Sequence, residues 1–283
     1  MPQSYLICEG PSDVKVLDKI IAQKLGLAVQ IYPAGGANGL GAVAAYFKQR
    51  FPHDRVFKIE DRDYRSRQVA VDSWHADSTS FIWQRHEIEN YLLTPGVVTA
   101  AFDLLGQANQ SSAKVLPQTQ AETEKLLHSL AAPMLENHAG WLTYKHLEKS
   151  LNPLKLNLSG TGNALSSRQA WLAHLQQECA RLQRSGSDLA VLPVLAQLEI
   201  EKLYEQQLAP LQQQDFLTSG KYLLDLKGKK MLRRLFQWLR REQAFRNLQK
   251  TDFEEKLIEA LEREYQPGYF DPDDFAELAT RLK

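Results

Sequence analysis

The sequence predicts an α/β protein, with a mainly parallel sheet in its first hundred residues joined to a large all-helical region. Short apolar runs alternate with helix-like stretches up to about residue 93, which is the pattern of βαβ units. Beyond residue 94 the strand signals fade, and Leu, Gln, Glu and Ala dominate. The 283 residues suffice for two domains, or for one domain with a large insertion.

Apolar periodicity predicts each element in turn. The continuous apolar run at 5–8 is typical of a buried strand, and the spacing of apolar residues over 14–25 is that of a helix facing a core. A polar stretch of uncertain structure is expected at 61–80. The further predicted elements are a strand at 28–32, a helix at 40–51, a strand at 55–60, a fourth strand at 81–83 and a helix that begins near residue 86.

We divide the chain into three parts. Residues 1–105 form the α/β core, residues 106–210 a helical region, and residues 211–283 a helical return segment. Turn-forming clusters break the helical region, and they lie at 152–153, 159–163 and 185–188.

The composition excludes several classes of protein. Hydrophobic residues make up 43% and charged residues 24%, near the globular average, which excludes a disordered chain. The 34 basic and 34 acidic residues exclude a globally basic nucleic-acid binder. Cys8 and Cys179 are too few for a disulfide framework and lack metal-site spacing, so we expect a reduced, cytoplasmic setting. Glu9 interrupts the first apolar run, so we expect no export signal and no membrane helix.

Charge is nevertheless segregated near the end of the chain. Residues 220–250 carry ten Lys or Arg against two acids, and residues 251–283 carry four against ten. One helix there has an apolar side and a basic side, the latter formed by Lys230, Arg233, Arg234, Arg240 and Arg241. Such a helix suits binding to nucleic-acid phosphates, and it equally suits a solvated face paired with the acidic segment.

Acidic residues follow two of the predicted strands. Glu9 and Asp13 come after the first strand, and Asp61 and Asp63 after the third. The carboxyl ends of parallel strands are the usual ligand site of open α/β sheets, so these acids can converge. If the strand continues, Asp61 and Asp63 share one face and can bind a hard divalent cation together. Asp13 suits a helix cap as well as a metal ligand.

Four motifs together resemble a known family. They are Glu9-Gly10 with Asp13, Asp61-x-Asp63, the segment RHEIENYLL at 85–93, and SGKYLL at 219–224. The first two resemble the Toprim domain of topoisomerases, primases and OLD-family nucleases. The third looks like the RxEIENYLL segment, and the fourth is similar to the GKxLL segment, of OLD-like Toprim proteins, which include stand-alone effectors of phage-defence systems such as PARIS. The resemblance covers about the first hundred residues and a patch near residue 220.

The resemblance implies a fold and a set of site residues. The fold is a Rossmann-like Toprim core, and the cofactor is Mg²⁺ or Mn²⁺, as one or two ions. The expected metal ligands are Glu9, Asp13, Asp61, Asp63 and Glu89. Glu87 is the alternative to Glu89, because residues two apart do not share a face of a regular helix. The expected catalytic residues are Glu9 in acid or base work, Asp61, Asp63, and Lys221 as the electrostatic partner.

Several of these residues have a structural interpretation as well. Lys221 equally suits an ordinary exposed lysine at a helix start, and Asn90 suits either holding a carboxylate or capping a local turn. Tyr91 and Leu92 are expected in the core, and His86 on the surface or behind the metal ligands, outside the catalytic set. The glycine-rich loop at 35–41 does not match the dinucleotide fingerprint; it suits a backbone contact to phosphate or a plain tight turn.

The resemblance implies a metal-dependent endonuclease that hydrolyses phosphodiester bonds in DNA or RNA and acts as a defence effector under an ATPase partner. Its partners would be a nucleic-acid substrate and that ATPase, with no membrane; a monomer and a homodimer both stay open. The alternative is a catalytically silent Toprim subunit that binds or regulates. Primase-like nucleotidyl transfer is less favoured, because no zinc module or nucleotide-binding segment is recognisable.

Overall fold

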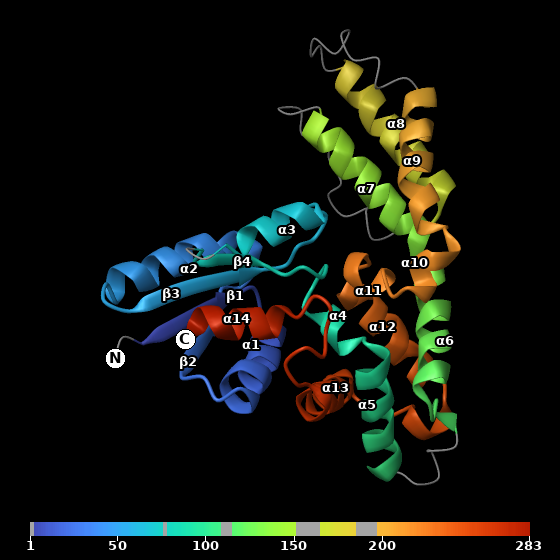
Figure 1. The fold of residues 1–283 in the computed structure, drawn as a ribbon. Coiled ribbons are helices and arrows are strands. Elements are labelled where there is room, and N and C mark those ends of the chain that lie inside the picture. Colours follow the sequence, from blue (N-terminus) through green and yellow to red (C-terminus); the bar gives the residue numbers. More distant parts are fainter. Residues whose placement is uncertain (1–2, 76–77, 109–114, 151–164, 185–196) are drawn as a thin grey trace. The chain divides into compact units, whose positions relative to one another are not determined.

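The computed structural model describes residues 3–75, 78–108, 115–150, 165–184 and 197–283 (Figure 1). It divides into two compact units, Met1–Leu127 with Leu223–Lys283, and His128–Tyr222. The unit boundaries therefore fall at 127/128 and 222/223, where the sequence predicted 105/106 and 210/211. The predicted turn clusters at 152–153, 159–163 and 185–188 lie outside the described residues.

The first unit contains a four-stranded parallel sheet, as the sequence predicted at the level of an α/β fold. Its order is β2-β1-β3-β4, and every neighbouring pair is parallel. All five residues of β1 are buried, because strands flank it on both sides and helices cover both faces. The strands are β1 (Ser4–Cys8), β2 (Val29–Pro33), β3 (Arg55–Glu60) and β4 (Ser80–Ile82).

The crossover helices lie on opposite faces of the sheet (Figure 1). Helix α1 (Pro11–Leu17) continues as a π-helical segment, η1 (Asp18–Lys24), and leads to β2; α2 (Ala37–Arg50) leads to β3. Because β2 and β3 flank β1 on opposite sides, right-handed crossovers place α1 and α2 on opposite faces. Leu40 and Ala44 of α2 pack on Tyr5, Ile7 and Val56. Helix α3 (Arg67–Ser73) lies within the stretch predicted as polar.

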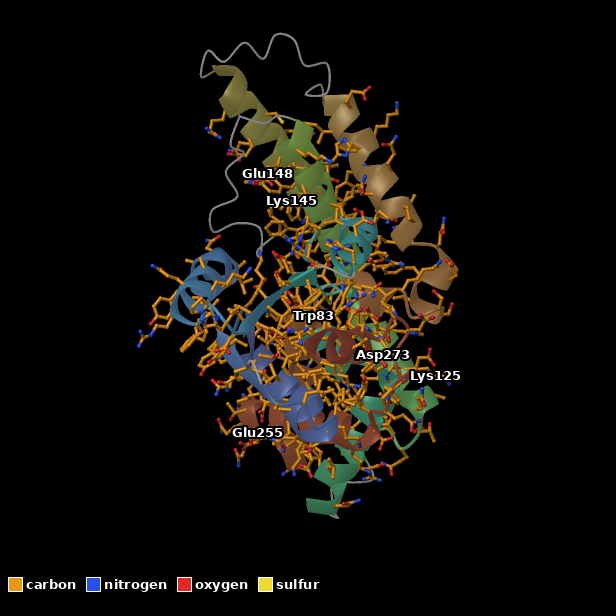
Figure 2. The ribbon with its side chains drawn as sticks, turned by 60° about the vertical axis from the view of Figure 1, so that its left-hand side comes forward. Trp83, Lys125, Lys145, Glu148, Glu255 and Asp273 are labelled. Carbon is orange, nitrogen blue, oxygen red and sulfur yellow. The ribbon has the colours of Figure 1, made fainter. Side chains whose placement is uncertain are left out.

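The end of the chain returns to complete the first unit. Helix α13 packs against α5, and α14 brings Phe275 against Trp83 and Tyr91. Figure 2 shows Trp83 among packed side chains and Glu255 at the outside. No described helix has both the length and the apolar character needed to cross a membrane. These elements are α4 (Glu89–Leu92), α5 (Pro95–Ala108), α12 (Gly228–Leu239), η6 (Gln243–Phe245), α13 (Lys250–Glu264) and α14 (Asp274–Leu282).

The second unit is helical. Helix α7 (Leu135–Ser150) packs against α8 (Arg168–Arg184) and α9 (Gln197–Leu211). Gly140 of α7 lies against Trp171, where a Cβ atom would come within 2.2 Å of the indole ring, so only glycine allows this approach. Helix α6 (Gln120–Ala131) spans the first boundary and α11 (Tyr222–Asp225) the second. The remaining elements are η3 (Ala132–Met134) and α10 (Gln214–Thr218).

Candidate metal centre

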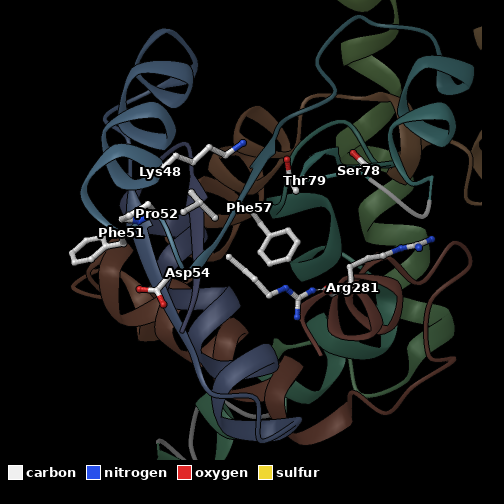
Figure 3. A pocket seen from close by; sticks show the side chains of 10 residues that line it. Lys48, Phe51, Pro52, Asp54, Phe57, Ser78, Thr79 and Arg281 are labelled. Carbon is white, nitrogen blue, oxygen red and sulfur yellow. Dashed lines mark hydrogen bonds between the residues drawn. The ribbon is translucent and has the colours of Figure 1, made fainter. Parts of the chain in front are cut away.

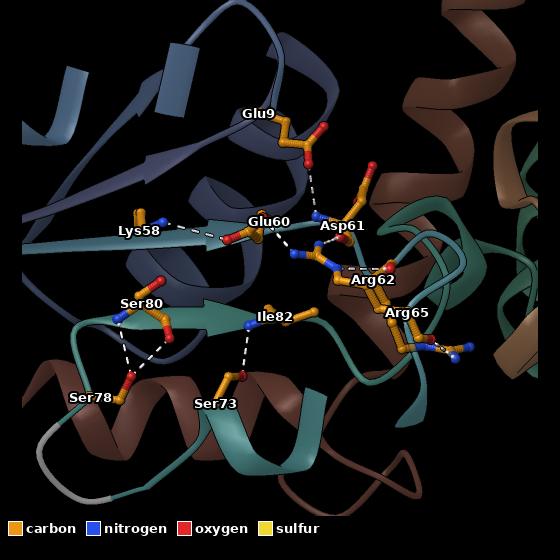
Figure 4. Close-up of polar contacts among 10 residues, drawn as sticks. All are labelled: Glu9, Lys58, Glu60, Asp61, Arg62, Arg65, Ser73, Ser78, Ser80 and Ile82. Carbon is orange, nitrogen blue, oxygen red and sulfur yellow. Dashed lines mark hydrogen bonds and ion pairs between the residues drawn. The ribbon is translucent and has the colours of Figure 1, made fainter. Parts of the chain in front are cut away.

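Glu9 and Asp61 meet at the carboxyl ends of the two central strands. Glu9 follows β1 and Asp61 follows β3. The chain reverses its winding direction at β1, and ligands of open α/β sheets bind in the crevice at such a reversal. The Glu9 Oε1 atom accepts the backbone N–H of Asp61 at 2.9 Å (Figure 4). The structure therefore brings these two predicted site residues together.

Asp13 lies in the first turn of α1 and is buried. Its Oδ2 atom accepts the backbone N–H of Gly10 at 2.7 Å, so it does cap the helix. Burial, followed by the charge of Asp61, raises the pKa of Asp13 to about 7. The cap uses one oxygen of the carboxylate, so capping and metal binding are compatible at this residue.

Asp61 is the most enclosed of the central acids, with 3% of its surface exposed. Its Oδ2 atom lies 2.9 Å from the Lys229 ammonium, while its buried Oδ1 atom has no hydrogen-bond partner. Burial raises the pKa of Asp61 despite the opposing charge of Lys229. A buried carboxylate oxygen without a donor is unfavourable, so this atom is a ready ligand for a cation.

Glu87 and Glu89 both face Lys229, which corrects the expectation that only one of them points into the site. The Glu87 Oε2 atom accepts the Lys229 backbone N–H at 2.7 Å, and Glu89 Oε2 lies 4.0 Å from the Lys229 ammonium. Helix α4 begins at Glu89, so Glu87 lies in the turn before it and the helical-spacing argument does not apply. Burial raises the pKa of Glu89 to about 8, and Glu89 Oε2 has no hydrogen-bond partner.

The lysine of the acidic cluster is Lys229, a residue that the sequence analysis did not select. Burial alone would lower the pKa of Lys229, but the charges of Asp61, Glu89 and Glu87 raise it, so the ammonium stays charged. Lys221 belongs to the second unit, where its ammonium pairs with Asp215 at 2.5 Å.

Asn90 and Gly228 hold the start of α12 against the turn that carries Glu87. The Asn90 Oδ1 atom accepts the Glu87 backbone N–H at 2.9 Å, and Asn90 Nδ2 donates to the Leu226 carbonyl at 2.9 Å. A Cβ atom on Gly228 would lie 2.6 Å from Asn90 Oδ1, so glycine is needed for this approach. Asn90 thus caps the local turn, because its side chain bonds the backbone of Glu87 and of Leu226.

Arg62 links the loop after β3 to the residues that precede α12. Its buried guanidinium donates to the Leu224 carbonyl at 2.6 Å and to Asp225 Oδ1 at 2.8 Å, and Arg67 donates to Asp225 at 2.6 Å. Burial alone would raise the pKa of Asp225, but the two arginines bring it below its ordinary value. Asp61 and Lys229 are therefore held by one network of buried polar contacts.

Asp63 is placed by a turn and not by strand alternation, and its charge still adds to the larger effect of burial in raising the pKa of Asp61 and of Glu9. Strand β3 ends at Glu60, and Asp63 has a left-handed φ of 51°, so the strand does not continue and alternation does not bring the two acids to one face. Asp63 is exposed and groups with His86 and Glu87, each offering a ligand atom within 4.8 Å of the others. His86 is fully buried, which corrects the surface position considered for it, and Tyr64 packs edge-on against its ring.

Five acids of the cluster carry the ligand type that hard divalent cations prefer, while the described residues that bring three ligand atoms within 4.8 Å of one another are Asp63, His86 and Glu87. Glu9, Asp13, Asp61, Glu87 and Glu89 supply carboxylate oxygens, the ligand type that Mg²⁺ and Mn²⁺ prefer. All five have a raised pKa with burial as its largest cause, so the cluster holds more negative charge than its surroundings stabilise. Glu89 also borders a cavity of about 120 Å³ between α1, α4, α12 and α13.

The predicted basic helix is α12 with the residues that follow it. Its predicted apolar side is buried, and Arg233, Arg240 and Arg241 are exposed while Lys230 and Arg234 are partly buried. Among the described residues, none of these four arginines has a carboxylate at ion-pair distance. The acids of 251–283 instead pair with lysines and arginines elsewhere: Lys15, Lys19, Lys250, Lys256, Arg263 and Arg281.

The fold and the site together define an α/β protein with a buried acidic cluster at the reversal point of a parallel sheet. No protein-family model matches the chain, and no curated protein matches it in sequence.

Sequence reasoning missed Lys229 and Asp225. A signal for the first was present, because Gly228-Lys229 is a second Gly-Lys pair and is followed by Met231-Leu232. Nothing in the sequence distinguished Asp225, whose role depends on contacts with Arg62 and Arg67, about 160 residues earlier in the chain.

Proposed function

We propose that the carboxyl edge of the sheet is the active site of a divalent-metal-dependent phosphodiester hydrolase acting on nucleic acid. The observation that carries the proposal is the pair of buried carboxylate oxygens, on Asp61 and Glu89, that lack a hydrogen-bond donor within an acidic cluster. Glu9, Asp13, Asp61 and Glu89 would hold Mg²⁺ or Mn²⁺, with Asp63 and Glu87 beside them. A bound ion supplies a Lewis acid and an activated water at neutral pH.

The chain's own residues suit this chemistry. Glu9 is half-buried, and burial, then the charge of Asp61, raises its pKa above the ordinary value, which favours its use as a proton donor or acceptor toward a reacting oxygen. The Lys229 ammonium, kept charged by its acidic neighbours, would offset negative charge that develops on the phosphate. Asn90, Arg62 and Gly228 would keep Lys229 and Glu87 in position.

Helix α12 extends from this site and favours a polyanionic substrate. Burial, then the neighbouring charges of Arg234, Lys227 and Arg233, lowers the pKa of Lys230 to about 8. Like charges that repel each other strongly enough to shift a pKa create a positive potential suited to DNA or RNA phosphates. Neutralising Arg233 should make nucleic-acid binding less sensitive to salt: the slope of log K against log salt concentration should fall in magnitude by about one.

The class that we propose is the OLD-like Toprim nuclease. Glu9 and Asp61, of the first two motifs, follow adjacent strands at the reversal point, and Glu87 and Glu89 of the third motif face Lys229, the partner of Asp61. A defence role and an ATPase partner rest on the motif resemblance alone. A catalytically silent Toprim subunit is the second candidate, and one observation favours it: Lys229 already neutralises part of the cluster, as a built-in cation would in a site without metal.

Mn²⁺ binding and strand cleavage, measured in parallel, test the proposal. The full-length chain is titrated with Mn²⁺ by calorimetry, and supercoiled DNA and labelled RNA are offered with Mn²⁺, with Mg²⁺ and with a chelator. We expect saturable binding and metal-dependent cleavage that falls at least about a hundredfold in Glu9→Gln and Asp61→Asn.

Asp72→Asn, on the exposed side of α3, is the matched control and should leave both measurements unchanged. Circular dichroism establishes that all three variants fold. Mn²⁺ binding without cleavage would favour the silent subunit, and a wild-type chain that binds no Mn²⁺ would contradict both candidates.

A further inference from the structure

A second cavity lies at the opposite edge of the same sheet. It has a volume of about 460 Å³ and opens at the amino ends of β3 and β4 (Figure 3). The acidic cluster lies at the carboxyl ends of the strands, so the two sites are separated by the length of β3. This volume falls within the range of small-molecule sites and far exceeds the size of a single phosphate group.

Arg55 is fixed in this cavity, and none of the described carboxylates lies at ion-pair distance from it. Its guanidinium donates to the Arg281 carbonyl at 2.6 Å and to the Leu282 carbonyl at 3.3 Å, and it lies over the Phe57 ring at 4.9 Å. These bonds use two of its five N–H groups. An arginine held in this way is pre-organised, and its remaining donors are available to a ligand.

Two further cations line the cavity. Arg281 pairs with Glu277 and donates to the Trp74 carbonyl, but its buried Nε atom has no hydrogen-bond partner. Lys48 is exposed and has no carboxylate at ion-pair distance among the described residues. The lining contains one acid, Asp54, so positive charge and unused N–H donors are in excess.

The other part of the lining is flat and apolar. Phe51 is partly exposed and stacks on the ring of Tyr5 at 5.0 Å, and Phe57 forms a wall beneath Arg55. Aromatic rings and arginine planes are surfaces on which nucleobases stack. Phosphate oxygens, in turn, are the acceptors that arginines bind bidentately.

We propose that this cavity binds a free nucleotide, with Lys48, Arg55 and Arg281 on its phosphate and with the partly exposed Phe51 beside its base. The site is separate from the proposed metal centre and needs no metal. It would give the protein a small-molecule ligand as well as its nucleic-acid substrate.

Binding to the metal-free full-length chain, measured by calorimetry in a chelating buffer, tests this site independently of any hydrolytic activity. The ligands are AMP, GMP, CMP, UMP, adenosine, inorganic phosphate and a short oligonucleotide. We expect saturable binding of at least one nucleotide, and binding of adenosine and of inorganic phosphate at least about tenfold weaker.

Lys48→Ala should weaken nucleotide binding about three- to tenfold, and Arg55→Lys about tenfold, because lysine lacks the planar fork. Arg50→Ala removes an equal charge from an exposed position of the same helix as Lys48 and should change affinity less than twofold. If the Arg55→Lys variant does not fold, nucleotide binding by Lys48→Ala, a change at an exposed position, tests the proposal. The proposal is overturned by absence of nucleotide binding, by phosphate binding as tightly as nucleotide, by binding of the oligonucleotide alone, or by indifference to Lys48→Ala.

Discussion

At the carboxyl ends of the strands, here the carboxyl edge, several buried carboxylates surround one lysine, Lys229. At the amino ends, here the amino edge, the cavity is lined by two arginines and a single aspartate. The charge of Asp61 raises the pKa of both Glu9 and Asp13, and that of Glu9 raises the pKa of Asp13, in each case after the larger effect of burial. At the second edge Arg55 is stabilised by carbonyl oxygens and an aromatic ring.

The direction of the helices explains this difference. The connecting helix α1 begins at the carboxyl end of β1, as in any parallel sheet, whereas α12 and α14 connect no strands but likewise begin at the carboxyl edge and end at the amino edge, respectively. Helix starts present N–H groups, which Asp13 and Glu87 accept at the starts of α1 and α12. Helix ends present carbonyls, which Arg55 binds at the end of α14.

Each edge is nevertheless incompletely satisfied among the described residues: both have a buried arginine Nε–H without an acceptor, on Arg62 and on Arg281, and the carboxyl edge also has carboxylate oxygens without donors. These oxygens belong to Asp61 and Glu89. The carboxylate oxygens without donors distinguish the carboxyl edge and support the cation site proposed there, and the excess of cations over acids in the lining supports the anion site proposed at the amino edge.

Replacing Lys229 should have the largest effect on the acidic edge. Removing its charge by Lys229→Met should reduce strand cleavage about a hundred- to a thousandfold, because the phosphate loses its electrostatic partner. The same change should tighten Mn²⁺ binding, because a competing cation next to Asp61 is gone. Cleavage assays and Mn²⁺ calorimetry on one preparation measure both quantities.

Lys221→Met is the matched control, because it removes the other lysine of a Gly-Lys pair and that lysine is paired with Asp215. We expect its cleavage and Mn²⁺ affinity to stay near wild type. A strong loss of cleavage in Lys221→Met, with little effect of Lys229→Met, would reverse the assignment and return the catalytic role to the residue chosen from the sequence.

The pH dependence of stability should reveal the excess of acids directly. The pKa values of Asp13 and Glu89 are raised to about 7 and about 8, so the folded state keeps protons that the unfolded chain has lost. The free energy of unfolding of the metal-free protein should therefore fall as pH rises from about 5 to about 8. Each unit of pKa shift corresponds to about 1.4 kcal/mol, so Asp13 alone accounts for a few kcal/mol of this fall in the free energy of unfolding.

Denaturant unfolding at several pH values measures this fall. Asp13→Asn should make it shallower, and Mn²⁺ should stabilise the protein more at pH ~8 than at pH ~6. Asp274, buried with a pKa of about 6, contributes a fall of the same sign that Asp13→Asn leaves in place. Asp72→Asn serves as the exposed control. A stability that rises across this window would show that the acids are not held protonated.

The sequence predicted the sheet and the first half of the site because those features depend on local pattern. The strand at 55–60 coincides with β3, and an acid directly after a buried strand must lie at the strand's end. Glu9 and Asp61 could therefore be chosen before their contact was known. The same reasoning failed at Asp63, where one left-handed residue ended the alternation that the prediction assumed.

The other half of the site depends on contacts between distant segments, which no local pattern contains. Lys229 reaches Asp61 because Asn90 binds the carbonyl of Leu226, and because Gly228 lacks a side chain. Two Gly-Lys pairs eight residues apart are equivalent as sequence, and only packing distinguishes them. The turn before α4 likewise allows Glu87 and Glu89 both to face Lys229, whereas regular helical spacing would point them in different directions.

A small change at the amino edge should test whether the two edges act independently. Asp54 is the one acid in the basic cavity and accepts the backbone N–H of Gln3 at 2.9 Å, a bond that asparagine can keep. Asp54→Asn should tighten nucleotide binding by roughly two- to fivefold at low salt, the size typical of exposed charge pairs, and the gain should fade as salt is added. Mn²⁺ binding should not change, because six residues of β3 span about 20 Å, roughly two Debye lengths at physiological salt. An altered Mn²⁺ affinity, measured against Asp72→Asn, would mean that the two edges are coupled through the sheet, and the two proposed sites would then belong to one extended site.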